Sequence, residues 1–255
     1  MSVSTQQPGA AATPAIALHN LTLGYERHPA VHHLSLTIPG GSLVALAGPN
    51  GAGKSTLIKA LAGQVRPIHG QIRGLDQQRI AWLPQQHELD RQFPITVRDM
   101  VAMGLWHQVG ALRRFCTAHR EQCAAALATV GLTGFEARTL DTLSGGQMQR
   151  ALFARLILQD APIVLLDEPF AAVDNRTTDD LLALLHRWHA QGKTVIAVLH
   201  DLAHIRAHFP LTLLLARECI AWGATAEVLS PTHWARAQRM PEAFNEAAPL
   251  CEEDA

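Results

Sequence analysis

The sequence predicts an α/β protein with a parallel-sheet core, an N-terminal antiparallel β subdomain and an inserted α-helical subdomain. Three observations lead to this fold class. Strand patterns come first, the stretch from about 91 to 140 has helical patterns without a strong strand signal, and strands alternate with helices after that. A chain of 255 residues is long enough for one large domain with an insertion.

The composition fits one α/β domain and argues against other classes. Apolar residues make up 48% of the chain, yet no run approaches the roughly 18 consecutive apolar residues that span a bilayer. The formal net charge is −1 and no block of Lys or Arg forms a basic patch, so we expect no nucleic-acid partner. Residues 1–14 are small and polar without a signal-peptide pattern, and residues 241–255 are acidic. We therefore expect two disordered tails around a domain that spans residues 15–240.

Strand patterns dominate the first third of the chain. Residues 16–23 and 31–38 read as strands separated by turn-prone residues, which predicts an antiparallel flap. Residues 43–47 form a compact apolar strand, and a helix over 56–62 follows that ends at Gly63. The remaining strands expected in this part are the short segments 71–73 and 79–83.

Helical and alternating patterns make up the rest of the chain. Helices over 97–106 and 120–130 are expected to form the inserted subdomain, about residues 91–140. After Gly146 the alternation of helix and strand predicts parallel strands connected by helices. The expected elements are a helix to residue 158, a strand over 163–166, a helix over 176–190, strands over 194–199, 211–215 and 219–222, and helices over 224–229 and 232–239.

A glycine-rich loop follows the strand at 43–47. It reads Gly48-Pro49-Asn50-Gly51-Ala52-Gly53-Lys54-Ser55 and satisfies the GxxxxGK[ST] pattern between a strand and a helix. The glycines let backbone N–H groups converge on phosphates, Lys54 neutralises phosphate charge, and Ser55 offers a hydroxyl to Mg²⁺. Thr56 can add a phosphate contact. The loop predicts a P-loop NTPase that binds a nucleotide with Mg²⁺.

Polar side chains stand where other apolar strands end. Asp167 and Glu168 end the strand at 163–166, at the edge where open α/β sheets place their ligands. Asp167 can orient Mg²⁺, and Glu168 is placed to act as general base for the attacking water or to orient it. His200 follows the strand at 194–199 and can reach the γ-phosphate, while Gln85 can contact Mg²⁺ or the attacking water. These residues predict hydrolysis of the bound nucleotide.

A second anion-binding element lies upstream of these carboxylates. In Leu143-Ser144-Gly145-Gly146-Gln147, Ser144 and Gln147 have the spacing of a capping box, which predicts a helix start. The two glycines leave backbone N–H groups uncovered there, and such a helix start attracts anions.

These residues together resemble the ATP-binding cassette (ABC) ATPase family over about residues 16–239. In that family the 48–55 loop is Walker A, Gln85 the Q-loop glutamine, and residues 143–147 the signature. The resemblance also makes residues 163–168 Walker B with its catalytic glutamate, and His200 the switch histidine. Tyr25 matches the aromatic residue that stacks on adenine and Asp174 lies on the D-loop, where Ala171 replaces a common Ser and puts one cross-subunit hydrogen bond in question.

The resemblance implies ATP and Mg²⁺ as cofactors and a composite site. In this family Walker A and Walker B of one cassette meet the signature helix of another, and this chain holds one complete set of motifs. Two cassettes are therefore expected, as a homodimer or with a related chain. A regulatory subunit without turnover would lack the carboxylate that Glu168 supplies.

Narrower features resemble the zinc, manganese and iron importer branch, which makes zinc the expected cargo, with manganese or iron as the alternatives. Phe170 after Glu168-Pro169 is the best single marker, and siderophore, heme and vitamin-B12 importers are the nearest alternatives. The resemblance implies a cytoplasmic ATPase on the inner face of the membrane, with permease subunits docking on residues 86–106 and a periplasmic or extracellular solute-binding protein acting indirectly. Phe93, Met100, Met103 and Trp106 form either that docking seat or part of the core. A soluble ABC ATPase acting on DNA or ribosomes is a distant alternative, because this chain lacks the long coiled-coil insertion or second cassette of those members.

Cysteine and histidine usage leaves two interpretations open. The four cysteines form no CxxC pair and lack secretory context, so reduced structural thiols are expected. Cys116 with Cys123, and His204 with His208, have spacings that place both side chains on one helix face. Such pairs suit a metal-sensing site or ordinary packed residues, and the lack of a four-ligand cluster favours the second interpretation.

Overall fold

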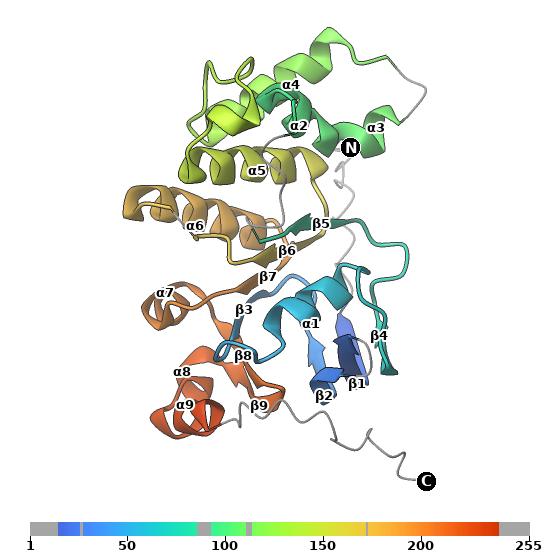
Figure 1. Cartoon of the computed structure of the whole chain (residues 1–255), viewed down its shortest axis with the longest axis vertical. Helices are drawn as coiled ribbons and strands as arrows, with labels where there is room; N and C mark the ends of the chain where they lie inside the picture. Colours follow the sequence, from blue (N-terminus) through green and yellow to red (C-terminus); the bar gives the residue numbers. More distant parts are fainter. Residues whose placement is uncertain (1–14, 26–27, 86–92, 111–113, 172, 240–255) are drawn as a thin grey trace, which may run out of the picture.

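Two β-sheets organise the chain. The computed structural model describes residues 15–25, 28–85, 93–110, 114–171 and 173–239. The tails expected over 1–14 and 241–255 lie outside this part. The larger sheet has the strand order β5-β6-β7-β3-β8-β9, and the smaller one has the order β2-β1-β4 (Figure 1).

The larger sheet is the core of the fold. Its first five strands in spatial order are parallel, and three of them are buried along their whole length, which explains their continuous apolar runs. The predicted parallel core is confirmed, but the last strand is antiparallel because only Arg217 connects it to its neighbour. The strands are β3 (Leu43–Ala47), β5 (Ile80–Leu83), β6 (Ile163–Asp167), β7 (Thr194–Val198), β8 (Leu211–Ala216) and β9 (Glu218–Ala224).

The smaller sheet contains the predicted N-terminal flap. β1 (Ile16–Tyr25) pairs antiparallel with β2 (His28–Ile38) and with β4 (His69–Arg73). Apolar side chains of β1 and β2 pack with α1 (Lys54–Leu61) in one buried cluster. The helix α1 therefore fills the space between the two sheets, and it ends at Gly63 as expected, where the backbone φ of 76° suits glycine.

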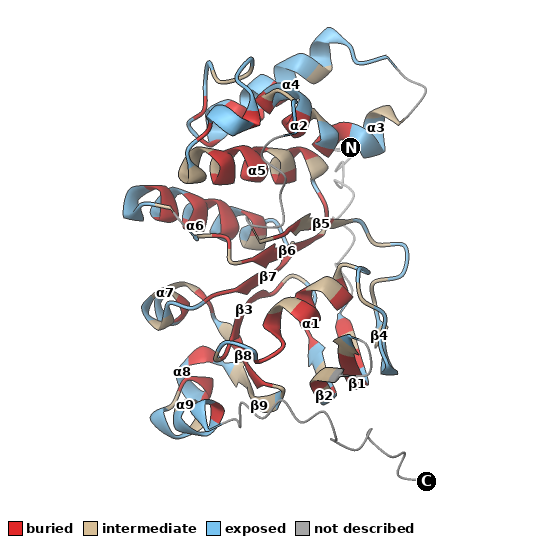
Figure 2. Cartoon of the chain, in the orientation of Figure 1, coloured by how far each residue is buried: buried red, intermediate tan, exposed pale blue. Residues whose placement is uncertain are grey.

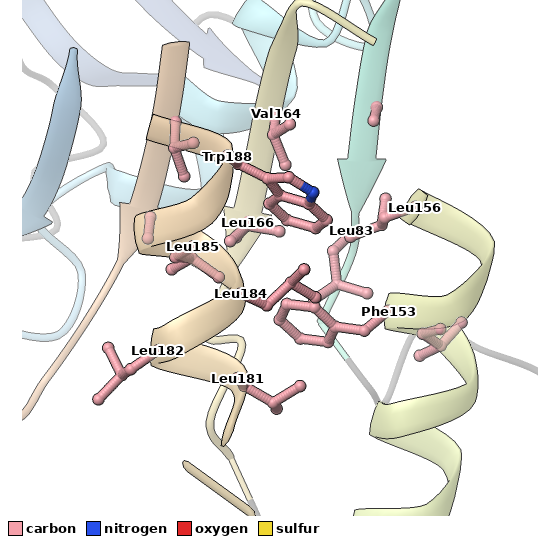
Figure 3. Packing of buried hydrophobic residues seen from close by; sticks show 14 of the residues in the cluster. Leu83, Phe153, Leu156, Val164, Leu166, Leu181, Leu182, Leu184, Leu185 and Trp188 are labelled. Carbon is pink, nitrogen blue, oxygen red and sulfur yellow. The ribbon is translucent and has the colours of Figure 1, made fainter. Parts of the chain in front are cut away.

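The opposite face of the larger sheet is covered by α5 (Gly145–Gln159) and α6 (Asn175–Ala190). Figure 1 shows these helices on the other side of the strands from α1, and Figure 2 shows that their inner faces are buried. Phe153 of α5 and Trp188 of α6 stack with ring centroids 6.1 Å apart, next to Leu83 and Leu166 of the sheet (Figure 3). This packing fixes α5 firmly against the sheet.

The stretch expected as a helical insertion holds short helices. They are α2 (Val97–Ala102), η2 (Met103–Leu105), α3 (Trp106–Val109), α4 (Thr117–Thr129) and η3 (Leu140–Thr142). An antiparallel bridge between Thr96 and Thr139 brings the two ends of this stretch together. The single helix expected over 97–106 is three pieces, and at Gly104 an added Cβ would lie 2.4 Å from the carbonyl oxygen of Arg155, so the segment runs very close to α5.

The C-terminal part adds three helices after β7. They are α7 (Leu202–His208), α8 (Thr225–Val228) and α9 (Pro231–Gln238). The sequence predicted the last two and missed α7, which begins where the Asp201 carboxylate accepts hydrogen bonds from the backbone N–H groups of Ala203 and His204. Within the described ranges, no helix is both long enough and apolar enough to cross a membrane.

Candidate functional site

Four neighbouring strands end at one edge of the larger sheet. Gln85 follows β5, Asp167 ends β6 and Glu168 comes directly after it. His200 follows β7, and the glycine loop 48–53 follows β3. Because the four strands are parallel, their carboxyl ends meet at this edge. The sheet order thus gathers groups that are up to about 150 residues apart in the sequence.

The glycine loop approaches neighbouring backbone closely. Gly48 has φ 151°, and an added Cβ would lie 2.0 Å from the carbonyl oxygen of Leu215. Gly53, at φ 89°, precedes α1, and its Cβ would lie 2.5 Å from the carbonyl oxygen of Ala30. Larger residues at either position would displace the loop, so the backbone N–H groups at the start of α1 depend on glycine for their placement.

Lys54 lies inside this loop. Its side chain is buried, and Nζ donates hydrogen bonds to the carbonyl oxygens of Gly48 at 2.9 Å and Pro49 at 2.8 Å. Burial lowers the pKa of the Lys54 ammonium, while the carboxylates of Glu168 and Asp167 act in the opposite direction. The Lys54 ammonium is therefore poorly hydrated, and it can replace its two carbonyl acceptors with phosphate oxygens.

A polar network connects the strand ends. Ser55 Oγ donates to Asp167 Oδ1 at 3.2 Å, and Gln85 Nε2 lies 3.2 Å from Ser55 Oγ and 2.8 Å from Glu168 Oε1. His200 Nε2 is 2.9 Å from the same Glu168 oxygen. The tautomer of His200 that has its hydrogen on Nε2 can donate this bond to the carboxylate oxygen. The structure thus brings together five of the predicted site residues.

The donor set at this edge fits Mg²⁺. Ser55 and Asp167 offer a hydroxyl and a carboxylate, the hard oxygen ligands that Mg²⁺ prefers, whereas Gln85 turns its amide Nε2 toward them and would have to rotate the amide to offer its oxygen. Three such groups leave room for water and phosphate oxygens in an octahedral shell. These are the residues predicted as magnesium ligands.

Thr56 and Tyr25 are the two remaining predicted nucleotide contacts near the start of the chain. Thr56 is buried in the first turn of α1, next to Ser55. Tyr25 ends β1 and is 51% exposed, which leaves its ring accessible to a base.

The signature residues belong to the other face of the sheet. Ser144 is the N-cap of α5, its hydroxyl accepts from the backbone N–H of Gln147 at 3.2 Å, and the Gln147 side chain accepts from the Ser144 N–H at 3.0 Å. The predicted capping box is therefore present. Gly145 and Gly146 open the helix, which lies across the sheet from α1 in Figure 1.

Asp174 is the N-cap of α6. Its carboxylate accepts from the backbone N–H of Thr177 at 2.9 Å and from the Thr177 hydroxyl at 2.8 Å, and these two bonds lower the pKa of Asp174. Arg150 of α5 donates to the same hydroxyl. The D-loop end of α6 is thus connected to the signature helix, a contact that the sequence did not predict.

Gln149 is a second contact that sequence reasoning missed. Its side chain is 1% exposed, and Nε2 donates to the carbonyl oxygen of Pro169 at 2.6 Å. A signal was available in the sequence, because Gln149 shares the helix face of Leu152, Phe153 and Leu156. A polar side chain on a buried helix face needs a hydrogen-bond partner.

The structure separates the apolar residues of the predicted docking segment. Residues 86–92 lie outside the described part of the chain. Met100 is 4% exposed and belongs to the core, which is the second of the two expectations for this residue. Phe93, Met103 and Trp106 are exposed at 55%, 51% and 65%.

The cysteine pair and the histidine pair are arranged differently in the structure. Cys116 precedes α4 and is exposed, whereas Cys123 is buried, so the expected common helix face is wrong. His204 and His208 do lie along one side of α7, with ring centroids 6.2 Å apart. Across the described ranges, no three His, Cys, Asp or Glu side chains are grouped to hold a metal ion.

The similarity to known proteins covers most of this chain. The ABC transporter family matches residues 31–171. The manganese transport system ATP-binding protein MntB of Bacillus subtilis is 40% identical over 221 residues, covering 84% of this chain and 88% of that protein. The zinc transport system ATP-binding protein TroB of Treponema pallidum is 36% identical over 229 residues, covering 88% and 86%.

Solved structures agree with this assignment. A metal-chelate type ABC transporter in an inward-facing conformation has a TM-score of 0.78 at 30% identity, over 89% of this chain and 90% of that one. A dimeric ATP-binding cassette in a post-hydrolysis state with ADP and Pi has a TM-score of 0.73 at 26% identity, over 82% and 98%. This chain therefore belongs to the ABC transporter family and is an ATP-binding cassette ATPase with the P-loop NTPase fold.

Proposed function

We propose that this chain is the ATP-hydrolysing subunit of an importer for a metal ion, with zinc or manganese as the transported ion. The observation that carries the proposal is the hydrogen-bonded group of Ser55, Gln85, Asp167, Glu168 and His200 at one sheet edge. Such a group is suited to hydrolysis of a bound triphosphate. The relatives named for manganese and zinc transport, similar over at least 84% of this chain, support the choice of cargo.

Different residues at the sheet edge bind the nucleotide and hydrolyse it. The glycine loop and Lys54 bind the β- and γ-phosphates, and Tyr25 stacks on the base. Glu168 accepts a proton from the attacking water or orients it, with its carboxylate held by Gln85 and His200. His200 is also placed at the edge where the γ-phosphate would lie.

Ser55, Asp167 and Gln85 would hold Mg²⁺, which when bound with ATP neutralises negative charge on the phosphates. The hydrogen bond from Ser55 to Asp167 connects the first turn of α1 with the end of β6.

Two copies of the chain complete each site. The N–H groups at the start of α5, at Ser144 to Gln147, bind the γ-phosphate held by the partner, because a helix start attracts anions. Asp174 lies at the start of α6, on the segment that crosses to the partner. ATP closes the dimer and hydrolysis reopens it, which alternates the access of the attached membrane subunits.

Membrane subunits dock on the helical stretch. Phe93, Met103 and Trp106 offer an exposed apolar seat of the kind that receives a short amphipathic helix. The chain would then work on the inner face of the membrane, and a solute-binding protein outside would deliver the ion. The domain boundaries proposed for this unit remain 15–240, with the helical insertion at about 91–140.

Metal content of cells tests the proposed cargo. In cells that lack this chain, zinc or manganese content measured by elemental analysis should fall under limitation of that metal. Wild-type protein should restore it, and Glu168→Gln should not, because transport needs hydrolysis. Unchanged contents of all metals would contradict the proposal.

A chelate importer is the second candidate function. It is favoured by the similarity to a metal-chelate type ABC transporter, at a TM-score of 0.78. In that case siderophore, heme or vitamin-B12 uptake would depend on this chain, and the free-metal contents above would not change.

A further inference from the structure

The buried amide of Gln149 connects the signature helix to the loop that follows the catalytic carboxylate. Gln149 lies on the second turn of α5, two residues after the signature. Its Nε2 donates to the carbonyl oxygen of Pro169 at 2.6 Å, and Pro169 directly follows Glu168. The contact therefore reaches the backbone one residue from the carboxylate that faces the water.

The backbone at Glu168 needs external support. Glu168 has φ 51°, in the left-handed region that non-glycine residues adopt only at a cost. Its carbonyl oxygen accepts from the Ala171 N–H at 3.2 Å, so residues 168–171 form a tight turn directly after β6. Strained backbone of this kind persists only when its surroundings hold it, and the Gln149 amide holds the second residue of the turn.

The helix that supplies this amide is itself firmly placed. Phe153, one turn beyond Gln149, is fully buried and stacks on Trp188 of α6 (Figure 3). Leu152 and Leu156 of the same helix are buried in the same cluster. The helix α5 is therefore a rigid support, and any movement of α5 is transmitted to Pro169.

We propose that Gln149 is a positioning residue for hydrolysis. It fixes the 168–171 turn, and with it the Glu168 carboxylate, from the helix whose N-terminus closes over the ATP of the partner cassette. This proposal rests on the composite dimer of the proposed function. Each copy of α5 then serves both ATP sites: its first turn binds the partner's nucleotide, and its second turn places the carboxylate for its own.

Single variants test the positioning role. Gln149→Met keeps the chain length of the side chain and removes the amide donor to Pro169. We expect kcat to fall roughly ten- to hundredfold, because small displacements of a reacting group have effects of this size, while the Kd for ATP stays within about twofold. Gln159→Met is the matched control, since Gln159 is the last residue of the same helix, and it should keep the wild-type kcat.

Mixed dimers separate positioning from simple support of the signature helix. One chain carries Glu168→Gln, so that each mixed dimer has one active carboxylate, and Gln149→Met is placed either in the active chain or in its partner. Positioning predicts that the dimer with both Gln149→Met and the active Glu168 in one chain is roughly tenfold slower than the other. If Gln149 only supports α5, the dimer that carries Gln149→Met in the partner of the active chain should be equally slow or slower, because its altered α5 closes over the active site. That result overturns the proposal.

Two checks keep the outcomes distinguishable. ATP-driven dimerisation of Glu168→Gln, measured by gel filtration, is done first. Its absence contradicts the composite dimer, while the single-variant kcat still tests Gln149. If Gln149→Met does not fold, as judged by thermal unfolding, Gln149→Asn takes its place, because its amide is one methylene too short for the 2.6 Å contact. A wild-type kcat in either folded variant overturns the role.

Discussion

Replacement of Glu168 by Gln is expected to stop hydrolysis and leave ATP binding intact. The hydrogen bonds from Gln85 Nε2 at 2.8 Å and His200 Nε2 at 2.9 Å both end on the same carboxylate oxygen, Oε1. A glutamine has one carbonyl oxygen, which can occupy this position and accept both bonds. The substitution therefore preserves the network and removes only the basic, negatively charged carboxylate.

The expected size of the effect follows from the role of a general base. Proton transfer by a positioned side chain contributes about 10²–10⁴-fold, which corresponds to about 2.7–5.4 kcal/mol of activation free energy. The loop at 48–55 and the Lys54 ammonium are unchanged, so the Kd for ATP should stay within about twofold. A loss of kcat without a loss of affinity is the signature of a transition-state role.

Phosphate release and a nucleotide titration on the same preparations measure both quantities. Glu227→Gln, an exposed substitution of the same kind on α8, is the matched control and should hydrolyse ATP at the wild-type rate. A Glu168→Gln rate within threefold of wild type would refute the general-base assignment. A parallel loss of ATP affinity would refute the claim that the network survives.

Three further outcomes follow from the geometry. Lys54→Met should lose the stabilisation that ATP gives the folded protein, about 2.7 kcal/mol at an ATP concentration of 100 Kd. The unfolding temperature of the nucleotide-free protein should not fall, because burial already disfavours the Lys54 ammonium. Calorimetry with and without ATP measures both effects. Ser144→Arg should abolish turnover while single chains still bind ATP in a titration, and equal loss of both would contradict the composite site. Phe153→Ala should destabilise the chain by about 3–5 kcal/mol in denaturant unfolding, because Phe153 is fully buried against Trp188; a loss under 1 kcal/mol would contradict the rigid seat of α5.

The strand-end residues could be predicted from the sequence because their signals are local. Each apolar run ends in a polar residue, and parallel strands bring such ends to one edge. The order of the strands was not predictable in the same way, because β3 lies next to β7 and β8, far along the sequence. Nor did the pattern indicate that β4 joins the smaller sheet while β5 joins the larger one.

Contacts between helices and loops, and strained backbone, could not be predicted from the sequence. The helix α7 was missed because its seven residues, which include His204 and His208, have only Ile205 buried and so no clear apolar periodicity. The left-handed backbone at Glu168 has no sequence signal, since glycine or asparagine would mark such a position. Gln149 could have been singled out as a polar residue on a buried face, but its partner depends on tertiary packing.

The two faces of the larger sheet carry different parts of the reaction. The phosphate loop opens α1 on one face, and the signature opens α5 on the other. A helix start on the far face cannot cover the nucleotide bound beside α1, so a second chain has to supply it. Gln149 connects that helix to the turn after β6 that begins at Glu168, and Arg150 connects it to Thr177 in the first turn of α6. In the proposed dimer, closure of one site would therefore bear mechanically on the other and would couple the two hydrolysis events.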